Sequence, residues 1–289
     1  MLYQLFMGIK MEQKSNNPLA KHFRQPAIYV KLPSNGRFWA EGSLELPASG
    51  EIPVFPMTAR DEITIRTPDA LLNGQGVVEV IQSCVPNIRD AWKMPSIDVD
   101  FVLLNIRIAS YGNAMEFDSE CPKCDEENNF ELSLGNITNS IVAPDYSQTL
   151  NIEGLQITLK PQPYFEVNRV SQIEFTEQQL MRTISDDSIS DDEKKVKSDA
   201  YLNKLIDLNV DVSVNSTQSI VTEDGTIVTS TAFIKEFYNM ADYKVLRTIQ
   251  KRLGEINSNS AIKPIHVTCV KCANEYDVPL TFDYANFFA

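Results

Sequence analysis

The stretch CPKC, at residues 121–124, has a counterpart near the other end of the chain in CVKC, at residues 269–272. Strand-like runs lie on both sides of each pair: AMEFDSE and DEENNFELSL around the first, PIHVT and ANEYDVPLTFDY around the second. The sequence therefore predicts two hairpins, each with a C-x2-C pair at its tip. They are the only self-similar units that the sequence contains.

Two C-x2-C pairs match the four thiolate ligands that Zn²⁺ takes in a tetrahedral site. Pro122 has a fixed φ that suits a tight turn, and Lys123 and Lys271 put a cation into each turn, where it offsets thiolate charge. We expect a structural Zn²⁺ with a closed ligand shell made of Cys121, Cys124, Cys269 and Cys272. The alternative is free or redox-active pairs, but a thioredoxin-like motif follows a strand and opens a helix, and neither pair does.

Composition and charge narrow the class of protein. The 289 residues are 43% hydrophobic and 22% charged, which is ordinary for a globular protein. Acidic residues outnumber basic ones by 39 to 26, for a net charge of −13. This charge disfavours binding to nucleic acid and suits basic patches on protein partners. No run approaches the ~20 apolar residues of a membrane helix, so no membrane association is expected.

The N-terminal run MLYQLFMGIK is apolar but short, and no cleavage-site pattern follows it. We do not interpret it as a signal peptide. Translation can begin at Met1 or at Met11, and the sequence does not decide between them. Residues 1–26 are expected to form a flexible arm in a cytosolic protein, where thiols stay reduced.

Before the first hairpin, the chain reads as strands followed by helices. Residues 27–66 contain the strand-like runs AIYVKLP and EITIR, and Pro53 and Pro56 indicate an edge or irregular strand. Helices are predicted from Pro68, over residues 74–85, and over residues 98–111 with Gly112 as the C-cap. The third should bury Val99, Val102, Leu103 and Ile106.

Residues 136–262 have a different character. They predict a hairpin turning at Glu153-Gly154, a helix after Pro163, and a second helix that buries Leu202, Leu205 and Ile206. A further hairpin over residues 210–230 should turn near Asp224-Gly225. The longest helix is predicted over residues 231–253, with Phe237, Ala241, Val245 and Ile249 at i,i+4 spacing.

These elements together predict an α+β fold with a split zinc ribbon. A core domain would comprise residues 27–135 and 263–289, with a β-rich start, helices and the ribbon. Residues 136–262 would form a mixed helix and hairpin subdomain inserted into it.

No other residue forms a convincing catalytic or binding site. Cys84 is expected to be a buried core thiol, His22 belongs to a basic arm, and His266 should lie on a strand face or beside the metal shell. The acidic run at residues 186–193 lacks the spaced oxygen pattern of a Ca²⁺ loop. With two histidines and no nucleophile or phosphate-binding motif, the chain is not expected to be an enzyme.

Long phrases in the first half resemble one known family. These are NPLAKHFRQPAIYVKLPSNGRFW, PVFPMTARDE, the run from Thr67 to Gly112, and EFDSECPKCDEE with its cysteines. They are similar to the baseplate hub subunit and hub assembly proteins of T-even-like contractile-tailed phages. The resemblance covers roughly residues 16–135, and the CVKC end agrees with it in form only.

The resemblance implies a structural or assembly protein of the baseplate central hub, which binds other hub and tail proteins and has no catalytic residues. Such a protein would act in the host cytoplasm during tail assembly, either as a factor that leaves or as a component that remains in the virion baseplate. A zinc-ribbon adaptor of transcription or replication is the alternative, and the net charge of −13 disfavours it.

Overall fold

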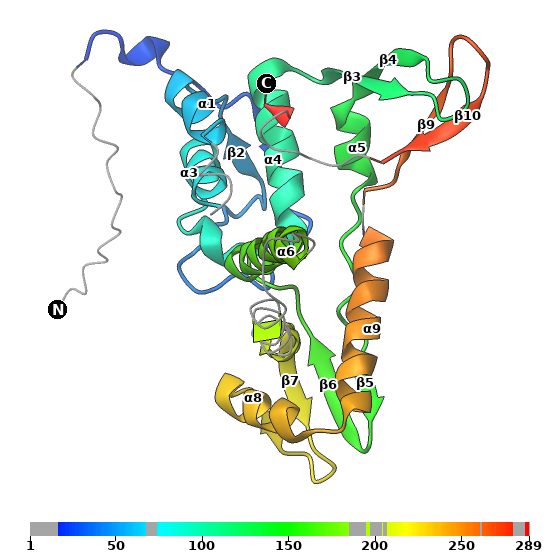
Figure 1. The fold of residues 1–289 in the computed structure, drawn as a ribbon. Helices are drawn as coiled ribbons and strands as arrows, with labels where there is room; N and C mark the ends of the chain where they lie inside the picture. The colour runs from blue at the N-terminus through cyan, green and yellow to red at the C-terminus, as the bar shows by residue number, and fades with distance from the viewer. Residues whose placement is uncertain are drawn as a thin grey trace, which may run out of the picture.

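The computed structural model describes residues 17–67, 74–184, 195–196, 204, 207–260, 262–279 and 287–288. Figure 1 shows helices combined with small antiparallel sheets, so the fold class is α+β, as predicted. The predicted helix from Pro68 and the helix with Leu202, Leu205 and Ile206 lie outside the described residues.

The N-terminal part begins with a short 3-10 helix, η1 (Ala20–His22), and a two-stranded antiparallel sheet, β1 (Ile28–Val30) with β2 (Ile52–Val54). The EITIR run, predicted as a strand, is instead part of helix α1 (Ala59–Ile65). A capping box is the physical reason: the Thr58 hydroxyl accepts from the N–H of Asp61, and the Asp61 carboxylate accepts from the N–H of Thr58.

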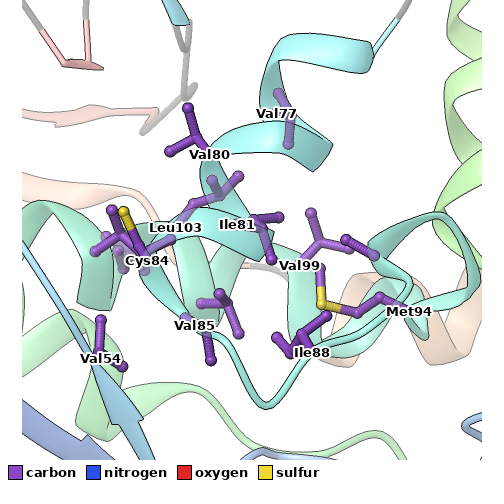
Figure 2. Close-up of a cluster of buried hydrophobic side chains, with 14 of the residues drawn as sticks. Val54, Val77, Val80, Ile81, Cys84, Val85, Ile88, Met94, Val99 and Leu103 are labelled. Atoms are coloured by element: carbon purple, nitrogen blue, oxygen red, sulfur yellow. The ribbon is translucent and has the colours of Figure 1, made fainter. Parts of the chain in front are cut away.

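Two further helices complete this part, α3 (Gln75–Cys84) and α4 (Ser96–Tyr111), joined by the 3-10 helix η2 (Ala91–Lys93). Both were predicted, and α4 ends at Gly112, which has a φ of 92°. Val99, Val102, Leu103 and Ile106 of α4 are all buried as expected. Figure 2 shows part of the core they share, with Val80, Ile81 and Cys84 of α3 and Val54 of β2 directed into it.

A buried carboxylate fixes the loop after β1 to helix α4. Asp98 is fully buried and accepts hydrogen bonds from the backbone N–H and hydroxyl of Ser34, at 2.9 and 2.5 Å, and from the indole N–H of Trp39 at 2.9 Å. Burial raises the pKa of Asp98 to about 6, although the bonds from Ser34 and Trp39 act in the opposite direction.

The chain then passes through the hairpin β3 (Ala114–Glu120) and β4 (Glu127–Ser133) and helix α5 (Leu134–Ser140) into a second body of structure. Its sheet has the order β5-β6-β7-β8 and comprises β5 (Leu150–Ile152), β6 (Leu155–Leu159), β7 (Thr217–Val221) and β8 (Ile227–Val228). The first hairpin turns at Glu153-Gly154 and the second at Asp224-Gly225, as predicted.

Helices α6 (Tyr164–Ile184), α8 (Thr231–Met240) and α9 (Tyr243–Ser260) accompany this sheet. A second buried cluster joins Ile157 and Ile220 of the sheet to Tyr238 of α8 and Ile249 of α9. Residues 207–215 are helical, so the prediction of a strand there is wrong. Val210 and Val214 are buried at i,i+4 spacing, which suits a helix as well as an apolar alternation suits a strand.

The prediction of a single helix over residues 231–253 is also wrong, because α8 ends at Met240 and α9 begins at Tyr243. Ala241 is extended, with φ −71° and ψ 155°, and Asp242 starts α9 by accepting from the N–H of Lys244 at 2.8 Å. Val245 and Ile249 are buried as predicted, while Phe237 and Ala241 are only partly buried.

The C-terminal segment returns to the N-terminal core. After the strands β9 (Ile265–Thr268) and β10 (Glu275–Val278), Phe287 and Phe288 are buried among the residues of the first cluster. The guanidinium of Arg66 donates to the carbonyl of Phe288 at 3.0 Å. Among the described residues, no helix is both long and apolar enough to cross a membrane.

Candidate metal centre

Two antiparallel hairpins carry the four cysteines, as predicted. β3 and β4 pair from Ala114 with Ser133 to Glu120 with Glu127, and β9 and β10 pair from Ile265 with Val278 to Thr268 with Glu275. The two hairpins are 145 to 151 residues apart in sequence at their cysteine contacts, yet they lie side by side in the upper right of Figure 1.

The two cysteine turns have the same backbone geometry. Cys121 donates its N–H to the carbonyl of Glu126 and Cys269 to that of Asn274, both at 2.9 Å. The residues after the second cysteine of each pair, Asp125 and Ala273, both have a φ of 55° and both donate to the first cysteine's carbonyl at 3.0 Å. This left-handed residue reverses the chain so that both sulfurs of a pair face the other hairpin.

The sulfur positions fit a tetrahedral metal site. The Sγ atoms of Cys121 and Cys272 lie 3.7 Å apart, as do those of Cys124 and Cys269. All four Sγ atoms lie within 4.8 Å of one another. A tetrahedron with Zn–S bonds of about 2.3 Å has S–S edges of about 3.8 Å, whereas a disulfide is about 2.0 Å long. The close pairs join different hairpins, which is the arrangement that a shared ion produces.

Burial and hydrogen bonding support the same interpretation. Cys121 and Cys269 are buried, and Cys124 and Cys272 are partly exposed. The N–H groups of Cys272 and Lys271 point at the sulfur of Cys269 and lower its pKa to about 6. The N–H of Glu126 acts in the same direction on Cys124, but hydrogen bonds shared with the other thiols and burial outweigh it and raise its pKa to about 12.

Polar contacts around the sulfurs join the two hairpins directly. Asn128, which is buried, donates to the carbonyl of Glu126 at 2.8 Å and accepts from the N–H of Val270 at 2.9 Å. The ammonium group of Lys271 lies 2.5 Å from the Glu126 carboxylate. Sequence reasoning missed Asn128, since an asparagine in a polar strand carries no signal that it spans two hairpins.

The other residues considered from the sequence, His266, Cys84 and His22, do not belong to the four-cysteine cluster. His266 is exposed on β9 and pairs with Asp277 at 2.9 Å and Glu275 at 3.6 Å, and Asp277 raises its pKa. Cys84 is fully buried in the first core cluster, as predicted, and burial raises its pKa to about 12. His22 is exposed in η1. None of the three joins a described group of metal-ligating side chains.

Comparison with known proteins gives one family. The model of the T4 bacteriophage base plate protein family matches residues 28–289, which include the N-terminal core, both cysteine hairpins and the sequence between them. No curated protein and no solved structure gives a match.

The match and the site together define a phage tail protein whose four clustered cysteines are consistent with a metal site. The chain belongs to the T4 bacteriophage base plate protein family. Membership implies a structural role in the baseplate of a T4-like phage and contacts with other baseplate proteins.

Proposed function

We propose that this protein is a structural or assembly component of the baseplate central hub and acts by binding other hub and tail proteins. The observation that carries the proposal is the family match over residues 28–289. The phrases of the first half that resemble hub subunits and hub assembly proteins support the hub as its location. In this proposal the protein folds in the host cytoplasm and joins the tail there.

Zn²⁺ held by Cys121, Cys124, Cys269 and Cys272 would have a structural role. Sulfur separations of 3.7 Å match the edges of a zinc tetrathiolate, and four protein ligands leave no open position for water or substrate. When bound, the ion supplies the positive charge that lets four neighbouring thiols ionise together. The chain's own contribution is the pair of matched turns and the N–H groups that they direct at sulfur. The proposed role is therefore not enzymatic.

The division of the chain that fits this role keeps residues 27–135 and 263–289 as one core domain and residues 136–262 as an insertion. Two buried clusters support it. The first draws on residues 32–134 together with Phe287 and Phe288, and the second on residues 146–256. Ile137 and Tyr164 are exceptions, because they belong to the insertion by sequence but lie in the first cluster, where Tyr164 also stacks on Trp92.

Quantitative mass spectrometry of purified virions beside a lysate of infected cells tests the proposal. A few copies per virion would identify a permanent hub component, and presence in the lysate alone would identify an assembly factor that leaves. Loss of the gene should stop baseplate assembly while heads still form. Normal tails in the deletion mutant would refute the proposal, and salt-dependent nucleic-acid binding would then favour a zinc-ribbon adaptor.

A further inference from the structure

Helix α9 has one face that the rest of the described chain does not cover. Its inner face packs Val245, Ile249 and Leu253 into the second buried cluster. On the opposite side Lys244, Arg247 and Lys251 are exposed at i, i+3 and i+7 spacing, so they form one stripe along about 10 Å of helix. None of the three forms a salt bridge with a described residue. This basic stripe is unusual in a chain with a net charge of −13.

The N-terminal end of the basic stripe carries exposed apolar groups. Tyr243, one turn before Arg247, is 70% exposed, and Met240 at the end of α8 is 85% exposed. Tyrosine, methionine and arginine are enriched in protein interfaces relative to the rest of the surface, whereas lysine is depleted there. The exposed Tyr243 and Met240 therefore favour a protein contact at this end of α9, and the positive charge of the stripe favours an acidic partner.

An acidic face of matching length lies on the first cysteine hairpin. Strands β3 and β4 alternate in burial, and their outward positions hold five carboxylates and one amide: Glu116, Asp118, Glu120, Glu127, Glu131 and Asn129. Glu116 stands directly opposite Glu131, and Glu120 directly opposite Glu127. Like charges that face each other across a strand pair are destabilising, and no described cation forms an ion pair with any of the five. A basic partner would remove this repulsion.

We propose that the basic stripe of α9 on one copy binds the acidic outer face of the β3–β4 hairpin on a second copy. The two faces have opposite charges and similar lengths, and the charged groups of neither face form an ion pair with another described residue. Three cations along about 10 Å of helix would meet carboxylates spread over about 13 Å of strand from Glu116 to Glu120. The proposal deepens the proposed function, on which it rests, by identifying one partner of this structural protein as the protein itself.

The two faces lie on different parts of one molecule, which determines the type of assembly. The hairpin is at the upper right of Figure 1, and α9 extends away from the cysteine hairpins toward the lower end, where Tyr243 begins it. Each copy therefore presents a donor face and an acceptor face. Such a heterologous contact joins copies head to tail and closes into a ring when the rotation between neighbours allows it.

Sedimentation velocity on the full chain, with zinc content measured in parallel, tests the proposal with two charge reversals. The helix variant changes Lys244, Arg247 and Lys251 to glutamate. The hairpin variant changes Glu116, Glu120, Glu127 and Glu131 to lysine; both cross-strand pairs stay like-charged, so the hairpin's own repulsion is preserved. If this variant does not fold, Glu116→Lys with Glu131→Lys replaces it. A matched control changes Lys21, Arg60 and Lys263, which are exposed elsewhere, to glutamate.

The wild-type chain should associate at low salt, and its association should weaken at least about tenfold at high salt because exposed charges are screened. Each reversal variant should be monomeric alone. An equimolar mixture of the two should associate, since the acidic helix of one variant meets four lysines on the hairpin of the other, and the unchanged basic helix meets the unchanged acidic hairpin. The control should associate like the wild type.

A wild-type chain that stays monomeric at about 100 μM overturns the proposal. A basic stripe that binds within its own chain would also leave the protein monomeric, so that case overturns the proposal as well. Association that survives either reversal, or a mixture that stays monomeric, also overturns it. Monomers with about one zinc per chain would leave the proposed function standing, because the metal site and the virion measurement do not depend on self-association.

Discussion

Replacing Cys269 by serine should remove the metal and destabilise the whole fold. Cys269 is buried, and its sulfur lies 3.7 Å from that of Cys124 on the other hairpin. Serine keeps the size of the side chain but replaces a thiolate with a hydroxyl, which is a poor Zn²⁺ ligand at neutral pH. Three thiolates then remain, and the link between residues 124 and 269 is lost.

The size of the effect follows from the length of chain that the metal closes. The span from Cys124 to Cys269 is 145 residues (269 − 124). Treated as a covalent cross-link, closing such a loop stabilises the folded state by about 5 kcal/mol through the unfolded chain's lost entropy. This is an upper limit, because the unfolded chain keeps residual structure that already restricts its conformations. A domain's total stability is about 5–15 kcal/mol, so the loss should be plain in any unfolding curve.

The assay combines metal analysis with denaturant unfolding, with and without a chelator. The wild type should carry about one zinc per chain and lose stability on chelation, while Cys269→Ser should carry none and show no further loss. Cys84→Ser is the matched control: it makes the same sulfur-to-oxygen change at a buried cysteine outside the cluster. It should cost about 1–3 kcal/mol for the buried hydroxyl yet keep its zinc.

Two results would refute the reasoning. A metal-free Cys269→Ser protein as stable as the wild type would show that the metal does not hold the fold together. Wild-type protein purified under reducing conditions without bound metal would show that the four sulfurs do not form a metal site.

Asp98→Asn should remove the pH dependence of stability that Asp98 causes. The folded pKa of about 6 lies above the ordinary value of 3.8, so the folded state takes up a proton first as pH falls. The stability of the wild type relative to the variant should therefore grow by up to about 3 kcal/mol between about pH 7 and about pH 4, as measured by urea unfolding. A constant difference would contradict the burial of the charged form. Phe288→Ala should cost about 3–5 kcal/mol in the same assay, against less than about 0.5 kcal/mol for the exposed Phe233→Ala. Ala273→Gly should stabilise the protein by about 0.5 kcal/mol, because glycine takes a φ of 55° without strain. The control Ala232→Gly in α8 should destabilise the protein by about 1 kcal/mol. A loss of stability in Ala273→Gly would show that the turn at residue 273 is not strained.

Local signals were enough to predict much of the fold. Alternating polarity around CPKC and CVKC gave both hairpins, and Glu153-Gly154 and Asp224-Gly225 gave the turns of the insertion's sheet. The buried face of α4 followed from its helical period, because that face packs on a single core. Each of these predictions depends on neighbours in sequence, where periodicity carries the information.

The failures occurred where a local pattern was compatible with two structures. EITIR alternates like a strand, but the capping box at Thr58 and Asp61 begins a helix just before it. The i,i+4 apolar spacing continued from Phe237 to Ile249, yet Asp242 capped a new helix within it. In both cases a side chain that accepts a hydrogen bond from a backbone N–H group begins a helix. The spacing of hydrophobic residues carries no information about such capping side chains.

The cysteine cluster brings together two hairpins that are far apart in the sequence. The insertion has an attachment of its own: Ser96 donates its N–H to Gln162 and Tyr164 donates to Met94, both at 2.8 Å, and Tyr164 stacks on Trp92. The C-terminal hairpin follows Ile262, which packs against the first cluster. Its contacts with the first hairpin run through the four sulfurs, Asn128 and the Lys271–Glu126 ion pair, and Phe287 and Phe288 are buried beyond it. A metal ion held by the four cysteines would add a further link between the end of the chain and its middle. A protein built this way can present the insertion and the ribbon as two separately anchored surfaces, which is what a subunit with several baseplate neighbours requires.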